Sequence, residues 1–206
     1  MSRRVLITGF GPFGNVTQNP AAAIAESLHG RRLRGRTLVG RILPVEFTHG
    51  PRELRRLIRE TEPELVVCLG VAASRQHITP ERVAINLVDA PIPDNAGAQP
   101  VDCRISANGA GAYFSTLPIK SIVEELSERG APVKLSSSAG EFVCNHIFYH
   151  LMKALRRTKG IRGGFIHVPL PTPTFGLEAQ IEAIRLAISV SLRVTRDSTR
   201  VPGRID

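Results

Sequence analysis

Two patterns of hydrophobic and polar residues alternate along this chain, and together they predict a regular succession of strands and helices. Short, continuous apolar runs are typical of strands buried on both faces of a sheet, and residues 65–69 form the clearest of them. Longer segments repeat their apolar residues every three or four positions, which indicates amphipathic helices. We expect strands at 5–8, 37–43, 65–69, 83–85 and 164–168, and helices that follow Asn19, begin near Cys144, and span 51–60, 119–129 and 177–194.

The boundaries of the first helix carry their own signals. Asn19 is a favoured N-cap, Pro20 suits the first helical position, and Gly30 marks the end of that helix. The alternation of strands and helices predicts one α/β domain over residues 1–206, a three-layer α/β/α sandwich with a largely parallel, twisted central sheet. Ligands of such sheets bind beyond the carboxyl ends of the strands. The polar segment 197–206 is predicted to be a frayed tail.

Composition narrows the class of protein. The chain has 206 residues, of which 42% are hydrophobic, and this size and balance favour a soluble globular domain. No apolar run reaches the roughly 18 to 20 residues that a membrane span requires. Three scattered cysteines suit neither a disulfide framework nor a metal site. With no signal-peptide core at the beginning of the sequence, we expect a cytoplasmic protein without a metal.

The formal net charge of +9 raises the alternative of a basic, nucleic-acid-associated protein. Arginines 52, 55, 56 and 59 form a stripe at helical spacing within the predicted helix 51–60. No zinc-finger, basic-zipper or RNA-binding aromatic motif accompanies them, so a solvated helix face is the simpler interpretation and no nucleic-acid partner is expected. Salt-dependent retention on DNA or RNA would test the alternative.

The segment 136–146 is the one around which the candidate chemistry gathers. It follows a short apolar run at Val133 and Leu135, and its small residues and Gly140 predict a tight turn from a strand into a helix. Cys144 then falls in the first helical turn, where unpaired backbone N–H groups and the helix dipole favour a thiolate and an oxyanion. A buried structural cysteine is the alternative. Because three serines precede it, we interpret Cys144 as a nucleophile.

A histidine is the natural partner of such a cysteine. His167 lies at the carboxyl end of the predicted strand 164–168, before a proline-rich turn, whereas His146 is two residues from Cys144 and on another helix face. A core histidine remains the alternative for His167. By residue type alone, Cys68 is a core residue, Cys103 has no assigned role, and Glu81 would be a surface glutamate.

The loop 9–14 places two phenylalanines directly after the first strand. Its glycines match the pattern G-x-G-x-x-G, which would suggest a dinucleotide site. Pro12 and the two aromatic rings crowd the approach of a pyrophosphate, and the helix begins only at Pro20. Aromatic walls for a small, flat ligand are therefore the favoured interpretation.

Several motifs along the chain, in a fixed order, give a specific resemblance. They cover residues 6–14 with 19–20, 78–86, 92–95, 142–146 and 163–167. With these motifs the sequence resembles the pyroglutamyl peptidase I family, whose members are also called pyrrolidone-carboxylate peptidases. The resemblance implies a thiol protease of α/β/α fold that removes N-terminal pyroglutamyl (5-oxoprolyl) residues from peptides without a cofactor. It also implies assembly as homodimers or homotetramers.

The resemblance assigns roles residue by residue. The catalytic triad of the family falls on Cys144, His167 and Glu81, and this is how Glu81 acquires a role that its residue type does not indicate. The pocket for the lactam ring falls mainly on apolar side chains, with one amide beside the substrate. The implied substrate-binding residues are Phe10, Phe13, Asn19, Val71, Ile92 and Phe142.

Three departures from the family pattern stand out. Val71 replaces a glutamine and Pro91 replaces an arginine that are common in bacterial members, and the segment 169–177 is shorter than in many relatives. The first two changes remove polar or charged groups from positions near the expected substrate. A weakened member that binds pyroglutamyl peptides without useful turnover is therefore the alternative function.

Overall fold

The computed structural model describes residues 3–14, 16–158 and 160–199, and its centre is a six-stranded sheet. The strands lie in the order β2-β3-β1-β4-β8-β5. The four central strands are parallel, while β2 and β5 pair antiparallel at the two edges, so the predicted largely parallel sheet is confirmed. The strands are β1 (Arg4–Phe10), β2 (Arg32–Leu33), β3 (Arg36–Leu43), β4 (Leu65–Val71), β5 (Thr79–Pro80) and β8 (Arg162–Val168).

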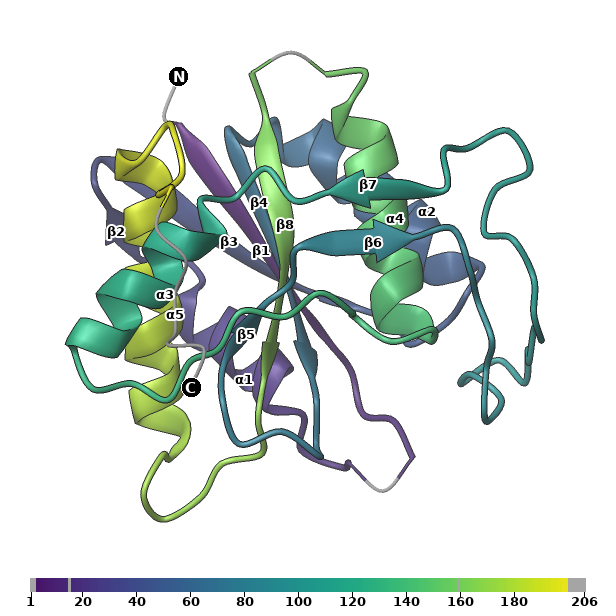
Figure 1. Cartoon of the computed structure of the whole chain (residues 1–206), viewed down its shortest axis with the longest axis horizontal. Helices are drawn as coiled ribbons and strands as arrows, with labels where there is room; N and C mark the ends of the chain where they lie inside the picture. The colour runs from purple at the N-terminus through teal and green to yellow at the C-terminus, as the bar shows by residue number, and fades with distance from the viewer. Residues whose placement is uncertain (1–2, 15, 159, 200–206) are drawn as a thin grey trace.

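Helices cover both faces of this sheet and complete the three predicted layers (Figure 1). On one face α1, α3 and α5 bury residues such as Ile24, Ile122 and Ile184 in a single apolar cluster. On the other face α2 and α4 bury residues such as Leu57 and Ile147 in a second cluster. The helices are α1 (Pro20–Leu28), α2 (His49–Thr61), α3 (Ile119–Glu128), α4 (Val143–Leu155) and α5 (Leu177–Arg193).

Strand β4 shows why its sequence is continuously apolar. Val67 and Leu69 belong to the cluster under α1, α3 and α5, whereas Val66 and Cys68 belong to the cluster under α2 and α4. Successive side chains of a strand point to opposite faces, so a strand covered on both sides needs apolar residues at every position. Cys68 is fully buried, which confirms its predicted place in the core.

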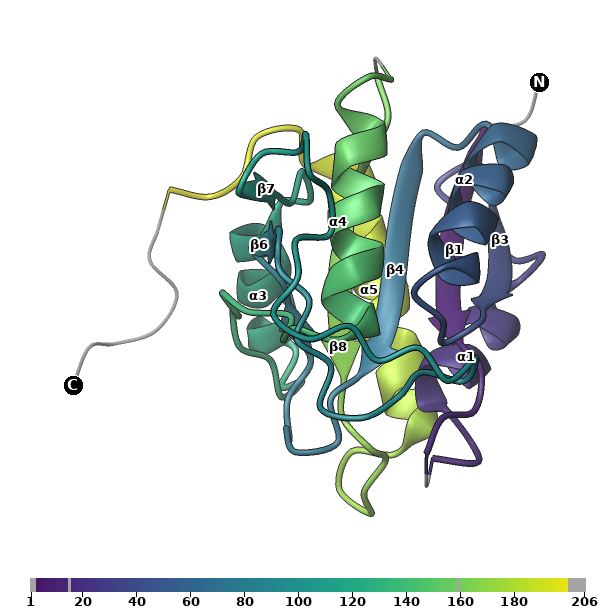
Figure 2. The same cartoon turned by 90° about the vertical axis from the view of Figure 1, so that its right-hand side faces the viewer.

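A second, two-stranded sheet of β6 (Val83–Ile85) and β7 (Ala112–Phe114) lies beside α4 (Figure 2). The buried Asn145 joins the helix to this small sheet. Its side chain accepts a hydrogen bond from the N–H of Ile85 and donates to the carbonyls of Ile85 and Leu87. The beginning of α4 is thereby fixed against β6.

Local interactions account for the beginning of α1 and for part of the arginine stripe on α2. Asn19 caps α1 by accepting a hydrogen bond from the N–H of Ala21 at 3.0 Å, as predicted. On α2, Arg56 forms ion pairs with Glu53 and Glu60 of the same helix. This pairing agrees with the interpretation of a solvated helix face.

Two regions differ from the expectation. No continuous strand directly precedes α4: Val133 and Ser136 form isolated bridges with Ile78 and Glu81, and backbone hydrogen bonds tie residues 132–136 to residues 78–82 at the sheet edge. Asp197, expected in a frayed tail, instead accepts hydrogen bonds from the N–H groups of Lys120 and Ser121 at the start of α3. The rest of that tail, residues 200–206, lies outside the described residues.

Candidate active site

Cys144 is the second residue of α4, in the first turn as predicted. The chain enters this helix through Gly140, whose φ of +76° belongs to the left-handed region that favours glycine. Phe142 then occupies the N-cap position in an extended conformation, and its side chain makes no capping hydrogen bond. The first N–H groups of a helix have no partner within the helix, so at this uncapped end they face the region of the thiol.

The sheet register places Cys144 beside His167. Gly70 of β4 and His167 of β8 are partners in the parallel ladder. A Cβ atom built on Gly70 would lie 2.9 Å from Sγ of Cys144 and 2.8 Å from the ring of Phe165. Phe165 precedes His167 by two residues, and their rings are 4.9 Å apart on the same face of β8. The thiol therefore lies over Gly70, on the face of the sheet that carries His167.

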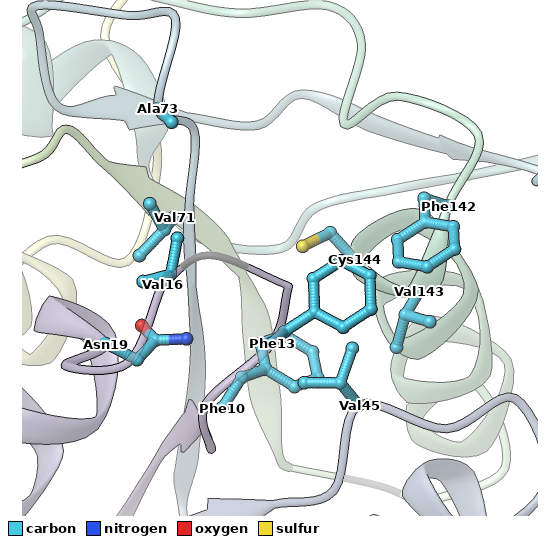
Figure 3. Close-up of a pocket in the computed structure, with 10 residues that line it drawn as sticks. All are labelled: Phe10, Phe13, Val16, Asn19, Val45, Val71, Ala73, Phe142, Val143 and Cys144. Carbon is cyan, nitrogen blue, oxygen red and sulfur yellow. The ribbon is translucent and has the colours of Figure 1, made fainter. Parts of the chain in front are cut away.

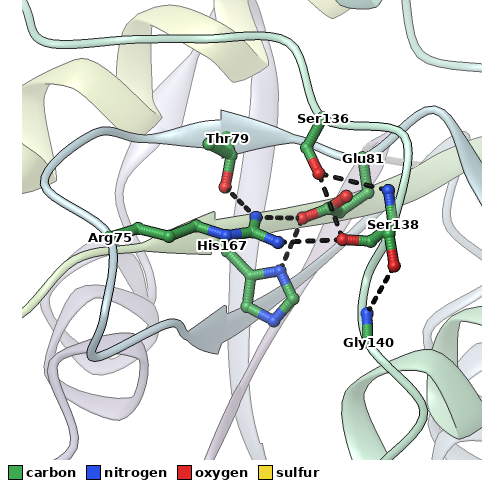
Figure 4. Close-up of polar contacts among 7 residues, drawn as sticks. All are labelled: Arg75, Thr79, Glu81, Ser136, Ser138, Gly140 and His167. Carbon is green, nitrogen blue, oxygen red and sulfur yellow. Dashed lines mark hydrogen bonds and ion pairs between the residues drawn. The ribbon is translucent and has the colours of Figure 1, made fainter.

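Behind the histidine lies Glu81, which is fully buried. Its Oε1 accepts a hydrogen bond from Nδ1 of His167 at 2.7 Å (Figure 4). The backbone fixes this carboxylate, because the N–H of Glu81 donates to the carbonyl of Phe165 at 2.9 Å. The surface position expected from its residue type is wrong, since pairing with β8 buries the segment that carries it.

Arg75 completes this polar cluster, and the sequence motifs gave it no role. Its Nη1 donates to Oε1 of Glu81 and to Oγ1 of Thr79, both at 2.6 Å, and its Nη2 donates to the carbonyl of Ser138 at 2.8 Å. A single guanidinium thus connects β5, the buried carboxylate and the loop before Cys144 (Figure 4). Arg75 follows β4 by four residues, and only the fold shows that it lies within hydrogen-bonding distance of the buried Glu81.

The surroundings of the thiol oppose its ionisation. Cys144 is partly buried, and its sulfur lies against the backbone of Gly70. Burial raises the pKa of the Cys144 thiol to about 12, the Glu81 carboxylate adds to this effect, and the Arg75 guanidinium acts against it. Burial of the thiol therefore opposes the thiolate that the helix terminus is expected to favour.

A cavity of about 230 Å³ opens in front of Cys144 (Figure 3). Aromatic contacts form one of its walls, with the rings of Phe13 and Phe142 5.2 Å apart and the ring of Phe47 set edge-on against Phe142 at 5.3 Å. The sulfur points toward the space between Phe13 and Val71. The lining residues are Phe10, Phe13, Val16, Asn19, Val45, Val71, Ala73, Phe142, Val143 and Cys144.

Most of the expected binding residues meet in this cavity. Phe10, Phe13, Asn19, Val71 and Phe142 all line it. Asn19 does so while its amide caps α1 and donates to the carbonyl of Gly11. By contrast, the structure does not bring Ile92 to the cavity lining, and its side chain is 47% exposed.

Two further searches concern metal and membrane. Within residues 3–14, 16–158 and 160–199, no group of three or more His, Cys, Asp or Glu side chains is placed to hold a metal ion. In the same described residues, none of the helices has the length and apolar character that crossing a membrane requires. The candidate catalytic groups at this site are the thiol of Cys144, the imidazole of His167 and the carboxylate of Glu81.

Comparison with known proteins gives one family. The family model described as pyroglutamyl peptidase matches residues 3–194. A pyrrolidone-carboxylate peptidase from Bacillus licheniformis is 44% identical over 214 residues, which cover 100% of both chains. Another, from Klebsiella pneumoniae, is 44% identical over 203 residues and covers 94% of this chain and 95% of its own.

Solved structures agree in fold. The crystal structure of the pyroglutamyl peptidase I from Bacillus amyloliquefaciens superposes with a TM-score of 0.93 at 40% identity, covering 98% of this chain and 100% of that one. The pyrrolidone carboxyl peptidase from Thermococcus litoralis also gives a TM-score of 0.93, at 38% identity, covering 97% and 99% of the two chains. The expected α/β/α architecture is confirmed along almost the whole chain.

Proposed function

The chain belongs to the pyroglutamyl peptidase family, and from this premise we propose that it is a cysteine peptidase that removes N-terminal pyroglutamyl residues from peptides. Cys144 is the nucleophile, His167 the general base and acid, and Glu81 the residue that orients the imidazole. The observation that carries the proposal is the thiol lying over Gly70, whose partner in the next strand is the Glu81-bound His167.

The hydrogen bonds assign the two nitrogens of the imidazole. Nδ1 of His167 donates to Glu81, which leaves Nε2 to accept a proton. Because burial raises the pKa of Cys144 to about 12, the thiol enters the reaction in its neutral form. Transfer of its proton to His167 therefore accompanies the attack of sulfur on the pyroglutamyl carbonyl carbon, rather than preceding it.

The remaining steps balance the proton and the bonds. The new C–S bond pushes the carbonyl electrons onto oxygen, and uncapped N–H groups at the start of α4 stabilise this oxyanion. The imidazolium then gives its proton to the leaving amine as the C–N bond breaks. Water attacks the acyl-enzyme, His167 takes the water's proton and returns it to the sulfur, and pyroglutamate leaves.

The cavity explains why the substrate would be a pyroglutamyl group. Its volume of about 230 Å³ is below the range of about 300–1,000 Å³ that is typical of sites for drug-sized ligands, so it suits a small ring. Its aromatic and aliphatic walls suit an uncharged lactam. Asn19 keeps a second amide N–H beyond the one donated to Gly11, and it is our candidate partner for the lactam carbonyl.

A matched pair of fluorogenic substrates tests the proposal. The purified chain should release the fluorescent amine from a pyroglutamyl amide and not from the corresponding prolyl amide, which lacks the lactam carbonyl and carries a charged nitrogen. Cys144→Ala should abolish this release. Binding of the pyroglutamyl amide without release would instead support the weakened family member, and equal rates on both amides would contradict the assigned pocket.

Two wider expectations also belong to the proposal. We infer one domain that acts in the cytoplasm, and homodimers or homotetramers as the family resemblance implies. Analytical ultracentrifugation of the purified chain tests the assembly. A single species with the mass of one chain at micromolar concentration would contradict it.

A further inference from the structure

Arg75 and His167 share a single oxygen of Glu81. Nη1 of Arg75 and Nδ1 of His167 donate to Oε1 at 2.6 Å and 2.7 Å. The other oxygen, Oε2, is buried and has no hydrogen-bond partner among the described residues. The guanidinium therefore acts at the same atom that orients the proposed catalytic base.

Two further bonds fix the position of this guanidinium. Nη1 also reaches Oγ1 of Thr79, and Nη2 reaches the carbonyl of Ser138. The Ser138 region is itself held by Ser136, whose Oγ donates to the carbonyl of Ser138 at 3.1 Å. Two residues later the chain turns at Gly140 into the helix that carries Cys144. Arg75 thus connects the carboxylate with the loop that leads to the nucleophile.

We propose that Arg75 is a positioning residue that holds the Glu81 carboxylate against His167 and fixes the loop before Cys144, an inference that rests on the proposed peptidase function. Its hydrogen bond at Oε1 fixes the atom to which Nδ1 of His167 donates, so the imidazole keeps the orientation that a general base requires. The same guanidinium charge acts on the Cys144 thiol and opposes the effect of burial there.

The pKa of the Cys144 thiol depends on the titratable groups around it. Besides Arg75 from the loop after β4, the groups placed against the site are the thiols of Cys144 on α4 and Cys68 on β4. Arg75 opposes the effects of burial and of Glu81 on the Cys144 thiol. Loss of its charge therefore makes removal of the Cys144 proton harder, and the reaction requires a higher pH.

The shape of arginine matters as well as its charge. The planar fork reaches three acceptors on two segments, namely Thr79 and Glu81 on one and the carbonyl of Ser138 on the other. A lysine at this position supplies the charge from a single nitrogen and cannot span the same set. Arg75→Lys should therefore restore the pH dependence better than it restores the maximal rate.

The first test compares pH profiles of kcat/KM on a pyroglutamyl amide. We expect Arg75→Gln to move the acidic limb upward by about one pH unit and to lower kcat/KM near pH 7 by about tenfold to hundredfold. The matched control is Lys134→Gln. Lys134 and Arg75 line the same hollow on the surface, so this substitution removes an exposed positive charge from that hollow without touching Glu81. An unshifted acidic limb in Arg75→Gln, or an equal shift in Lys134→Gln, overturns the proposal.

The second test restores the lost group from solution. In Arg75→Ala, added guanidinium ion should recover part of kcat/KM in a saturable manner, at concentrations too low to unfold the chain. The same ion should leave the native chain and Lys134→Gln unchanged. Because a merely structural loss would not respond to guanidinium, absence of rescue in a folded Arg75→Ala chain overturns the positioning role.

A readout without turnover separates this inference from the proposed function. Iodoacetamide alkylation of Cys144, followed by mass spectrometry of its peptide, reports the reactivity of the thiol even if no pyroglutamyl amide is cleaved. The rate against pH should rise later in Arg75→Gln than in the native chain, by about one pH unit. A failed peptidase assay with this shift would contradict only the function, whereas unchanged alkylation would overturn only the role of Arg75.

Discussion

The thiol of Cys144 lies against the backbone of Gly70, so closely that a single added carbon on the glycine would come within 2.9 Å of the sulfur. The same carbon would meet the ring of Phe165 at 2.8 Å. Glycine at this point of β4 therefore leaves the space in which the nucleophile sits beside His167. The position of the Cys144 thiol therefore depends on the absence of a side chain at residue 70.

Gly70→Ala should consequently inactivate the chain more than it unfolds it. We expect kcat/KM on a pyroglutamyl amide to fall by about a hundredfold or more, because the sulfur must leave its reacting position. The free energy of unfolding should fall by only about 1–3 kcal/mol, as for other overpacked cores. Gly111→Ala is the matched control, since nothing lies within 4 Å of the added carbon there. A Gly70→Ala chain with native activity would contradict this geometry.

His167 and Glu81 should contribute unequally to the rate of hydrolysis. His167→Ala should lose more activity than Glu81→Gln, because the imidazole transfers protons in both half-reactions while Glu81 orients it. A positioned acid–base group is typically worth about 10²–10⁴-fold in rate. Comparing kcat for the two variants at several pH values checks this order, and equal or reversed losses would mean that base and orienter are misassigned.

The sheet and the position of Cys144 in the first turn of α4 could be predicted from the sequence because their signals are local. The apolar run of β4 reports burial on both faces, and the start of α4 follows from the residues around Cys144. Glu81 could not be placed in this way. Its burial depends on pairing with Phe165, far along the chain, and no neighbouring residue reports that contact.

Arg75 and the stretch before α4 were missed for the same physical reason. The partners of Arg75 lie on two segments, Thr79 and Glu81 on one and Ser138 on the other, so a surface arginine and a bridging arginine look alike in sequence. At Val133 the apolar pattern predicted a strand, but two isolated bridges, Val133 to Ile78 and Ser136 to Glu81, form in place of a continuous ladder. An apolar pattern reports burial without reporting the backbone partner that makes a strand.

The cavity should gain affinity from a polar side chain at residue 71. Val71 lines the cavity, and the family resemblance places a glutamine at this position in many bacterial relatives. Val71→Gln should raise kcat/KM by about tenfold if the amide pairs with the lactam, mainly through a lower KM. Val71→Met, which is unbranched but has no amide, serves as the control. A gain in the methionine variant alone would assign the effect to shape instead.

Acid should destabilise the fold through two histidines of α4, the buried His146 and the partly buried His150. Burial lowers the pKa of His146 to about 4 and that of His150 to about 3, with the two rings 4.7 Å apart. Nδ1 of His146 is buried and, in the described structure, has no hydrogen-bond partner. Because these folded values lie below the ordinary value of about 6.5, the stabilisation is complete above that pH and is lost as the pH falls toward 4.

Urea unfolding between pH 7.5 and 4.5 measures this loss. His146 alone should contribute a decrease of about 2–3 kcal/mol over that range. His146→Gln, which cannot take up a proton, should give a flatter dependence of the unfolding free energy on pH. An identical slope in the native chain and in His146→Gln would contradict the assignment of acid sensitivity to this residue.

The most direct measurement of the central claim is the capture of the acyl-enzyme. The chain is mixed with an activated pyroglutamyl ester, quenched in acid within milliseconds to seconds, digested and examined by mass spectrometry. The account predicts a pyroglutamyl group on the peptide that contains Cys144, formed at a rate consistent with turnover and lost in His167→Ala. Hydrolysis of the ester by a Cys144→Ala chain at the native rate, or an adduct confined to Cys103, would contradict it.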